Sequence, residues 1–194
     1  MKIVMIGDVG VGKTTFMHCW ADGQRASIPG QYRPGVDSRH KAIRLDGREV
    51  DVQLWDTAGQ EQFGHFPTSF YRDAAGILLM FDVGNRASFE SARDAWAREI
   101  SRFALVDSRM LLVGLKANES EPAHSARRRE VSPEEGALLA VSLSTQELRP
   151  KGGQVRYVEC SSQSGEGVDQ AMSLLASFAL ESNPSHPAAA EGHA

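Results

Sequence analysis

Residues 7–14 have the types and the spacing of a loop that binds phosphate groups. They read Gly-Asp-Val-Gly-Val-Gly-Lys-Thr and fit the pattern G-x-x-x-x-G-K-[ST]. Glycines let the backbone curl so that successive N–H groups point at phosphate oxygens, and the helix that follows adds the positive end of its dipole. The residues expected to contact the phosphates are Val9, Gly10, Val11, Gly12, Lys13, Thr14 and Thr15.

Lys13 and Thr14 carry the reactive side chains of this loop. A lysine here places its charge on the β- and γ-phosphates of a nucleotide, and the threonine hydroxyl binds Mg²⁺. The context favours this interpretation over a glycine-rich turn without a ligand. An apolar run at 3–6 predicts a buried strand before the loop, and 15–21 predicts a helix after it.

Asp56, Gly59 and Gln60 form a second set of residues with matching chemistry. An acid at the end of an apolar strand is where a phosphate-loop protein holds Mg²⁺, usually through water. Gly59 can bring a backbone N–H to a terminal phosphate, and Gln60 can orient an attacking water. The predicted metal ligands are therefore Thr14 and Asp56, and the predicted catalytic residues are Gln60 and Lys13.

The elements that must position these residues alternate along the chain. Asp46-Gly47 predicts a hairpin turn between two of the strands. The order of elements predicts an α/β fold with a six-stranded, mostly parallel, doubly wound sheet, one antiparallel strand and helices on both faces. Strands are predicted at 3–6, 41–45, 50–55, 76–83, 110–115 and 155–158, and helices at 15–21, 88–103, from Ser132 onward and at 167–181.

Composition bounds the class of protein. A chain of 194 residues predicts one domain, here 1–182, followed by a disordered tail at 183–194. The formal charge of −4 argues against a nucleic-acid partner. The two cysteines predict a reducing, cytoplasmic setting, with Cys160 as a core residue just after a strand rather than a nucleophile. Neither a signal peptide nor a transmembrane segment is expected.

Taken together, these motifs resemble those of the small GTPases of the Ras superfamily, and most of all the Rab branch. The resemblance covers about residues 2–182 and rests on the phosphate loop together with segments at 35–37, 45–47, 52–63, 70–76 and 159–162. It implies a small G-protein fold that binds GTP or GDP with Mg²⁺. It also implies base contacts from Lys116, Asn118, Ser161 and Ser162.

Such a resemblance implies a nucleotide-dependent switch in intracellular or vesicle transport. Effector and regulator proteins would read two loops, switch I at about 24–38 and switch II at about 59–73. The C-terminal residues Glu-Gly-His-Ala contain no cysteine, so no prenyl anchor is expected on this chain. Any association with a membrane would then depend on a partner.

Two positions depart from the pattern where catalysis is concerned. Arg33 stands where the family places a threonine that binds Mg²⁺ and the γ-phosphate; it either reaches a phosphate oxygen or is an exposed arginine on a loop. Val9 stands where relatives often have glycine or serine; it either crowds Gln60 or leans away. Slow GTP hydrolysis is the expectation, and a nucleotide-binding interaction module with negligible hydrolysis is the alternative.

The residues expected to recognise the base also depart from the family pattern, because Asn118 stands where the family has an aspartate. An asparagine offers one acceptor and one donor where guanine presents two donors, so guanine preference should be relaxed and xanthine better tolerated. Glu119 could supply the carboxylate instead.

Of the remaining residues, the arginines 127–129 are expected on a solvated loop rather than in an anion site. Trp20, Trp55 and Trp96 are expected in the core or the switch surface.

Overall fold

The computed structural model describes residues 1–23, 37–56, 68–105, 107–116, 128–145 and 154–182. Its strands are β1 (Lys2–Ile6), β2 (Asp37–Leu45), β3 (Arg48–Asp56), β4 (Ala74–Asp82), β5 (Arg109–Leu115) and β6 (Arg156–Cys160). Its α-helices are α1 (Lys13–Asp22), α2 (Arg86–Ser91), α3 (Ala97–Phe103), α4 (Pro133–Thr145) and α5 (Val168–Ser182). A 3-10 turn, η2 (Thr68–Phe70), and a π-helical turn, η3 (Ala92–Trp96), complete the described elements.

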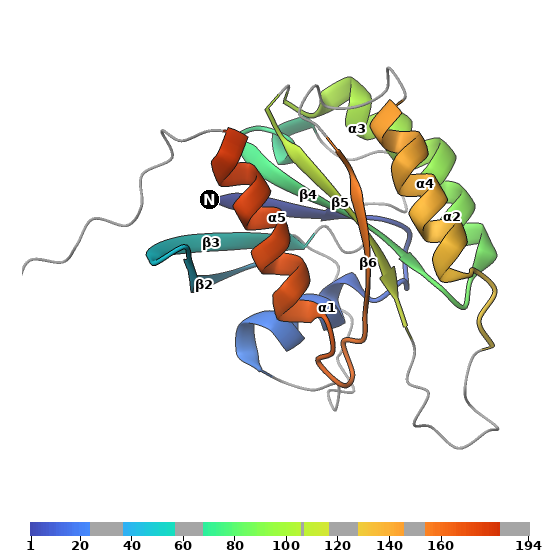
Figure 1. Cartoon of the computed structure of the whole chain (residues 1–194), viewed down its shortest axis with the longest axis horizontal. Helices are drawn as coiled ribbons and strands as arrows, with labels where there is room; N and C mark the ends of the chain where they lie inside the picture. Colours follow the sequence, from blue (N-terminus) through green and yellow to red (C-terminus); the bar gives the residue numbers. More distant parts are fainter. Residues whose placement is uncertain (24–36, 57–67, 106, 117–127, 146–153, 183–194) are drawn as a thin grey trace, which may run out of the picture.

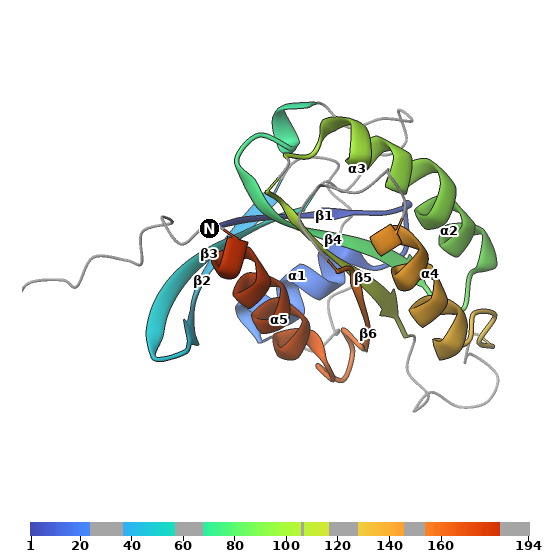
Figure 2. The same cartoon turned by 45° about the horizontal axis from the view of Figure 1, so that its top comes forward.

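The six strands form one sheet in the order β2-β3-β1-β4-β5-β6. All neighbouring pairs run parallel except β2 and β3, which are antiparallel. Figures 1 and 2 show α1 and α5 on one face of the sheet and α2, α3 and α4 on the other. The predicted fold class is therefore confirmed, including the single antiparallel strand.

Alternation of side chains along β1 explains why both faces are covered. Ile3 and Met5 lie in the core cluster shared with α1 and α5, whereas Val4 and Ile6 lie in the cluster shared with α2, α3 and α4. All four side chains are at most 2% exposed. A strand buried on both sides needs a continuous apolar run, and this pattern is typical of parallel sheets.

The hairpin between β2 and β3 turns at Asp46-Gly47, as the sequence predicts. Both residues have positive φ, 49° and 79°, which the tight turn requires. Leu45 pairs with Arg48 directly across the turn. β2 itself begins at Asp37, four residues before its predicted start, and its residues alternate between exposed and partly buried.

The predicted helix at 88–103 is not one continuous α-helix. α2 begins at Arg86, and the π-helical turn η3 separates it from α3. The N–H of Ala97 donates to the carbonyl of Ala92, five residues back, which defines the wider turn. Hydrophobic periodicity cannot distinguish this turn from regular α-helix, because the apolar stripe of Phe89, Trp96 and Ile100 is buried in either case.

The start of α4 is the helix start that the sequence predicts. Ser132 and Glu135 form a reciprocal capping box: the Glu135 N–H donates to the Ser132 hydroxyl, and the Ser132 N–H donates to the Glu135 carboxylate. Pro133 occupies the first helical position, where it loses no hydrogen bond. Among the described residues, no helix has both the length and the apolar character needed to cross a bilayer.

Candidate functional site

The phosphate-binding pattern lies between the end of β1 and the start of α1, where the backbone favours glycine at two positions. Gly7 has φ 151°, and a Cβ there would lie 2.2 Å from the carbonyl oxygen of Met80 on β4. Gly12 caps α1 with φ 107°. Because neither backbone geometry accepts a side chain easily, both glycines are explained by the shape of the loop itself.

Lys13 folds back over this loop rather than extending into solvent. Its side chain is buried, and Nζ donates to the carbonyl oxygens of Gly7 at 2.8 Å and Asp8 at 2.9 Å. The ammonium of Lys13, near the end of the loop, thereby holds the two residues at its start. A buried ammonium fixed on backbone carbonyls places a positive charge next to the loop in which an anion would sit.

Thr14 and Asp56 bring two oxygen ligands to one point. The Thr14 hydroxyl donates to Oδ2 of Asp56 at 2.5 Å, with Thr14 at the exposed rim and Asp56 only 1% exposed. β3 and β1 are neighbours, so the end of β3 lies beside the loop that follows β1. A hydroxyl and a carboxylate fit Mg²⁺, which takes oxygen ligands and keeps much of its shell from water and phosphates.

No larger metal-binding cluster competes with this pair within the ranges that the structure describes. No group of three or more His, Cys, Asp or Glu side chains there could hold a metal ion. A small protein ligand set completed by nucleotide phosphates is the ordinary arrangement for Mg²⁺ in phosphate-loop proteins.

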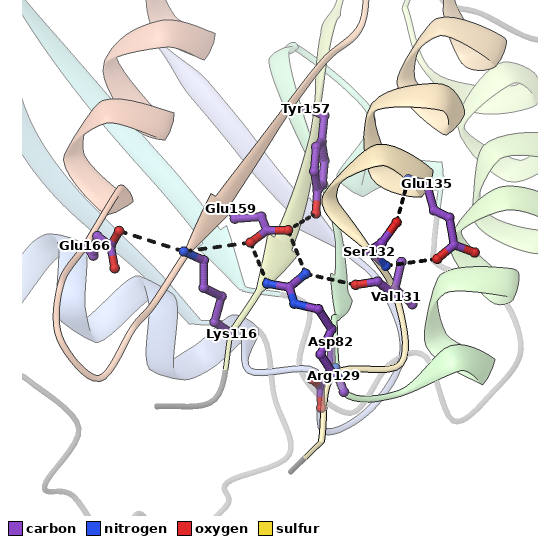
Figure 3. Close-up of polar contacts among 10 residues, drawn as sticks. Asp82, Lys116, Arg129, Val131, Ser132, Glu135, Tyr157, Glu159 and Glu166 are labelled. Atoms are coloured by element: carbon purple, nitrogen blue, oxygen red, sulfur yellow. Dashed lines mark hydrogen bonds and ion pairs between the residues drawn. The ribbon is translucent and has the colours of Figure 1, made fainter. Parts of the chain in front are cut away.

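The predicted base-side residues come together where β5 and β6 end. The N–H of Lys116 donates to the carbonyl of Cys160 at 2.8 Å, which places Lys116 beside the loop that carries Ser161 and Ser162. Its ammonium lies 3.7 Å from the Glu159 carboxylate and 3.8 Å from that of Glu166 (Figure 3). Three of the four predicted base contacts therefore share one edge of the sheet.

The two serines of this loop differ in their hydrogen bonding. Ser161 is tied into the loop: its N–H donates to the Glu166 carbonyl, and its hydroxyl accepts from the N–H of Ser164. Ser162 is equally buried, at 7% exposed, yet its hydroxyl has no hydrogen-bond partner among the described residues. A buried hydroxyl normally finds a partner, so Ser162 has a free polar atom at the place where the resemblance puts a base.

Glu159, just before the loop that carries Ser161 and Ser162, is the centre of a polar network (Figure 3). Arg129 grips both of its carboxylate oxygens, at 2.9 and 2.8 Å, and the Tyr157 hydroxyl donates to Oε1 at 2.7 Å. Burial alone would raise the pKa of Glu159, but the hydrogen bonds from Arg129 and Tyr157 hold this pKa below its usual value. Burial, together with the hydrogen bond to Glu159, raises the pKa of Tyr157.

The expectation that the arginines at 127–129 lie on a solvated loop is wrong for Arg129. Its guanidinium also donates to the Val131 carbonyl at 2.8 Å, so it joins the segment before α4 to β6. The bidentate pair of Arg129 with the half-buried Glu159 carboxylate therefore has a structural role, because it holds these two segments together. The sequence offers no signal for it, because Arg129 and Glu159 lie 30 positions apart.

Asp8 and Trp96 form a contact that sequence reasoning missed. The indole Nε1 of Trp96 donates to Oδ1 of Asp8 at 2.7 Å, across 88 positions of the chain. Trp96 is buried, as expected of a core residue, but it also touches the phosphate loop. A tryptophan in an apolar helical stripe predicts burial and carries no information about where its N–H points.

Two further residues of the loop differ in burial: Val9 is 53% exposed, and Val11 packs into the core at 6% exposed.

Cys160, which the sequence predicts as a core residue, is the last residue of β6 rather than the residue after it. Burial raises its pKa to about 12, which fits a core residue and not a nucleophile. Outside the described residues lie Arg33, Gly59, Gln60, Asn118 and Glu119.

Comparison with known proteins gives a consistent answer. The family model described as the Ras family matches residues 2–181. The chain is 37% identical to the Ras-related protein Rab-37 of Mus musculus over 175 residues, which cover 90% of this chain and 71% of the relative. It is 37% identical to human Rab-26, with 90% and 62% covered, and 34% identical to Rab-8A of Gallus gallus, with 90% and 76% covered.

Proposed function

The chain belongs to the Ras family of small GTPases, and from this premise we propose that it is a Rab-like switch that hydrolyses GTP slowly. The observation that carries the proposal is the convergence of Lys13 and Thr14, at the start of α1, with Asp56, at the end of β3; each is held by a hydrogen bond. This arrangement supports binding of a nucleotide's outer phosphates together with Mg²⁺.

Each residue would have a separate role in the reaction. Lys13 would stabilise negative charge on the β- and γ-phosphates, and the N–H groups of the loop would do the same for the oxygens they face. Gln60 would orient a water for attack on the γ-phosphorus, with GDP leaving and phosphate as the second product. Mg²⁺, held by Thr14 and Asp56, would neutralise charge that develops on the phosphate oxygens.

Two residues support the slow rate. Arg33 removes the threonine expected to bind Mg²⁺ from switch I, so this loop loses one anchor to the nucleotide. Val9 is 53% exposed in the phosphate loop. The family resemblance would put the approach of an activating partner to Gln60 near this position. A branched side chain there occupies space that a glycine would leave open.

The alternative function is a nucleotide-binding interaction module with negligible hydrolysis. Arg33, Asn118 and Val9 favour this alternative, and the intact set of Thr14, Asp56 and Gln60 favours the enzyme. In both cases effectors and regulators would read switch I at about 24–38 and switch II at about 59–73 in cytoplasmic vesicle transport.

Nucleotide binding would be the same in both cases. Gly59 would sense the γ-phosphate, and the base contacts would come from Lys116, Asn118, Ser161 and Ser162.

Single-turnover hydrolysis of GTP tests the proposal and separates it from the alternative. The natural protein should turn over GTP no faster than about 10⁻⁴ s⁻¹ without a partner, and Gln60→Leu should lower that rate further. Arg33→Thr combined with Val9→Gly should hydrolyse faster than the natural protein, because the variant restores a metal ligand and relieves crowding. A rate equal to that of the Gln60→Leu variant would instead identify the interaction module.

A further inference from the structure

Trp96 is the exception among the three tryptophans of this chain. All three indole rings are largely or partly buried, but the Nε1 atoms of Trp20 and Trp55 have no hydrogen-bond partner among the described residues. The Nε1 of Trp96 donates to the Asp8 carboxylate at 2.7 Å. Among the described residues, Trp96 is therefore the one tryptophan whose indole N–H is hydrogen-bonded to the phosphate loop.

Trp96 lies in the π-helical turn η3. Trp96 is its last residue, and the ring packs in the cluster on the sheet face covered by α2, α3 and α4. Asp8 lies two residues after the end of β1, whose Val4 and Ile6 belong to the same cluster. π-helical turns are rare and frequently occur at functional sites, which gives this wide turn a reason beyond packing.

Asp8 is consequently held at two points. Its backbone carbonyl accepts from Lys13 Nζ at 2.9 Å, and its carboxylate accepts from Trp96. An aspartate in a loop that binds phosphates carries the same sign of charge as the ligand. The indole N–H holds this carboxylate on the side of the helices, which fixes the loop. It also reduces the repulsion that a free carboxylate would exert on the phosphates of the ligand.

We propose that Trp96 is a positioning residue for the phosphate loop: through Asp8 it holds the loop in its binding form and thereby sets how long a nucleotide stays bound. The inference rests on the proposed function, because the ligand in question is the nucleotide. The junction between α2 and α3, which lies outside both switch segments, would then control the rate of nucleotide release.

Dissociation of a fluorescent GDP analogue from the full chain tests the proposal. Trp96→Phe keeps most of the ring and removes the N–H, so release should become about tenfold faster, the size expected for one lost hydrogen bond to a charged group. The matched control is Trp20→Phe, since that indole N–H has no hydrogen-bond partner within the part of the chain that the structure describes. It should change the release rate less than about twofold.

A double-mutant cycle separates positioning from general loosening of the fold. In an Asp8→Ala background the hydrogen bond is already absent, so Trp96→Phe should add no further acceleration. The indole N–H resonance of Trp96 in the natural protein should shift in Asp8→Ala, whereas those of Trp20 and Trp55 should not. This second readout does not depend on the folding of a tryptophan variant.

Two results would overturn the inference. One is equal release rates for Trp96→Phe and Trp20→Phe; the other is a Trp96→Phe effect of the same size with and without the Asp8 side chain. Either result leaves the proposed function standing if the natural protein retains GDP. A natural protein that binds no guanine nucleotide would contradict the proposed function itself, and this inference with it.

Discussion

The Thr14 hydroxyl donates to the Asp56 carboxylate over 2.5 Å, although 42 positions separate the two residues in sequence. The sheet order explains the approach, because β3 and β1 are parallel neighbours and both end at this edge. Thr14 follows β1 by way of the phosphate loop, and Asp56 is the last residue of β3. This pair is where the proposed function needs Mg²⁺ to lie.

Magnesium should slow nucleotide release only while this pair is intact. In the natural protein, chelation of Mg²⁺ with EDTA should speed the release of GDP, because a ligand to its phosphates is lost. Thr14→Val removes the hydroxyl at nearly constant volume, so release should be fast with or without EDTA. Thr14→Ser, which keeps the hydroxyl, is the control, and full EDTA sensitivity in Thr14→Val would contradict the assignment.

The preference for guanine should rise when Asn118 becomes aspartate. A carboxylate can accept from both donors of guanine, and a hydrogen bond to a charged group contributes about 1.5–3 kcal/mol, so GTP affinity should increase by roughly 10- to 100-fold. Competition titrations with GTP and XTP measure the change, and XTP should lose relative affinity in the variant. Unchanged GTP affinity in Asn118→Asp would mean that another residue, with Glu119 as the first candidate, reads the base.

Stability should fall in acid as Glu159 gains a proton. Its carboxylate has a folded-state pKa below the unfolded value of about 4.3, so the stabilisation is fully present above that value. It is lost as the pH falls through the lower, folded-state pKa, because the protonated carboxyl group releases Arg129. Urea unfolding at fixed nucleotide load, between pH 7 and pH 3, measures this loss.

The matched variants for this pH dependence are Glu159→Gln and Glu166→Gln. Glu159→Gln should cost about 1.5–3 kcal/mol at pH 7 and flatten the profile between neutral and acid pH. Glu166 is a largely exposed partner of Lys116, so its replacement should leave the profile almost unchanged. Parallel profiles for the natural protein and Glu159→Gln would show that the network does not carry the acid sensitivity.

Most of the fold follows from local sequence because its strands are buried. β4 and β5 are apolar except for Asp82 at the end of β4 and Arg109 at the start of β5. The cap at Ser132 and the turn at Asp46-Gly47 depend only on neighbouring residues. The start of β2 is harder to predict, since an edge strand with alternating polar residues lacks an apolar signal. Asp37, Ser38 and Arg39 therefore belong to a strand that the pattern does not mark.

The site shows the same division between local and long-range information. The phosphate-loop pattern and the proposed metal pair follow from sequence motifs, because a backbone that cradles phosphate leaves few choices of residue at Gly7, Gly12 and Lys13. The contacts of Asp8 with Trp96 and of Arg129 with Glu159 join distant segments. Only the three-dimensional packing of the sheet and its helices brings these partners together.

The central claim is that the loop between β1 and α1 binds a guanine nucleotide through Lys13. Purified protein should be denatured and the released small molecules separated by ion-exchange chromatography, alongside Lys13→Ala. The natural protein should release close to one equivalent of GDP or GTP, and the variant should release none while keeping its far-ultraviolet circular dichroism. Guanine nucleotide in equal amount from both proteins, or from neither, would contradict the account.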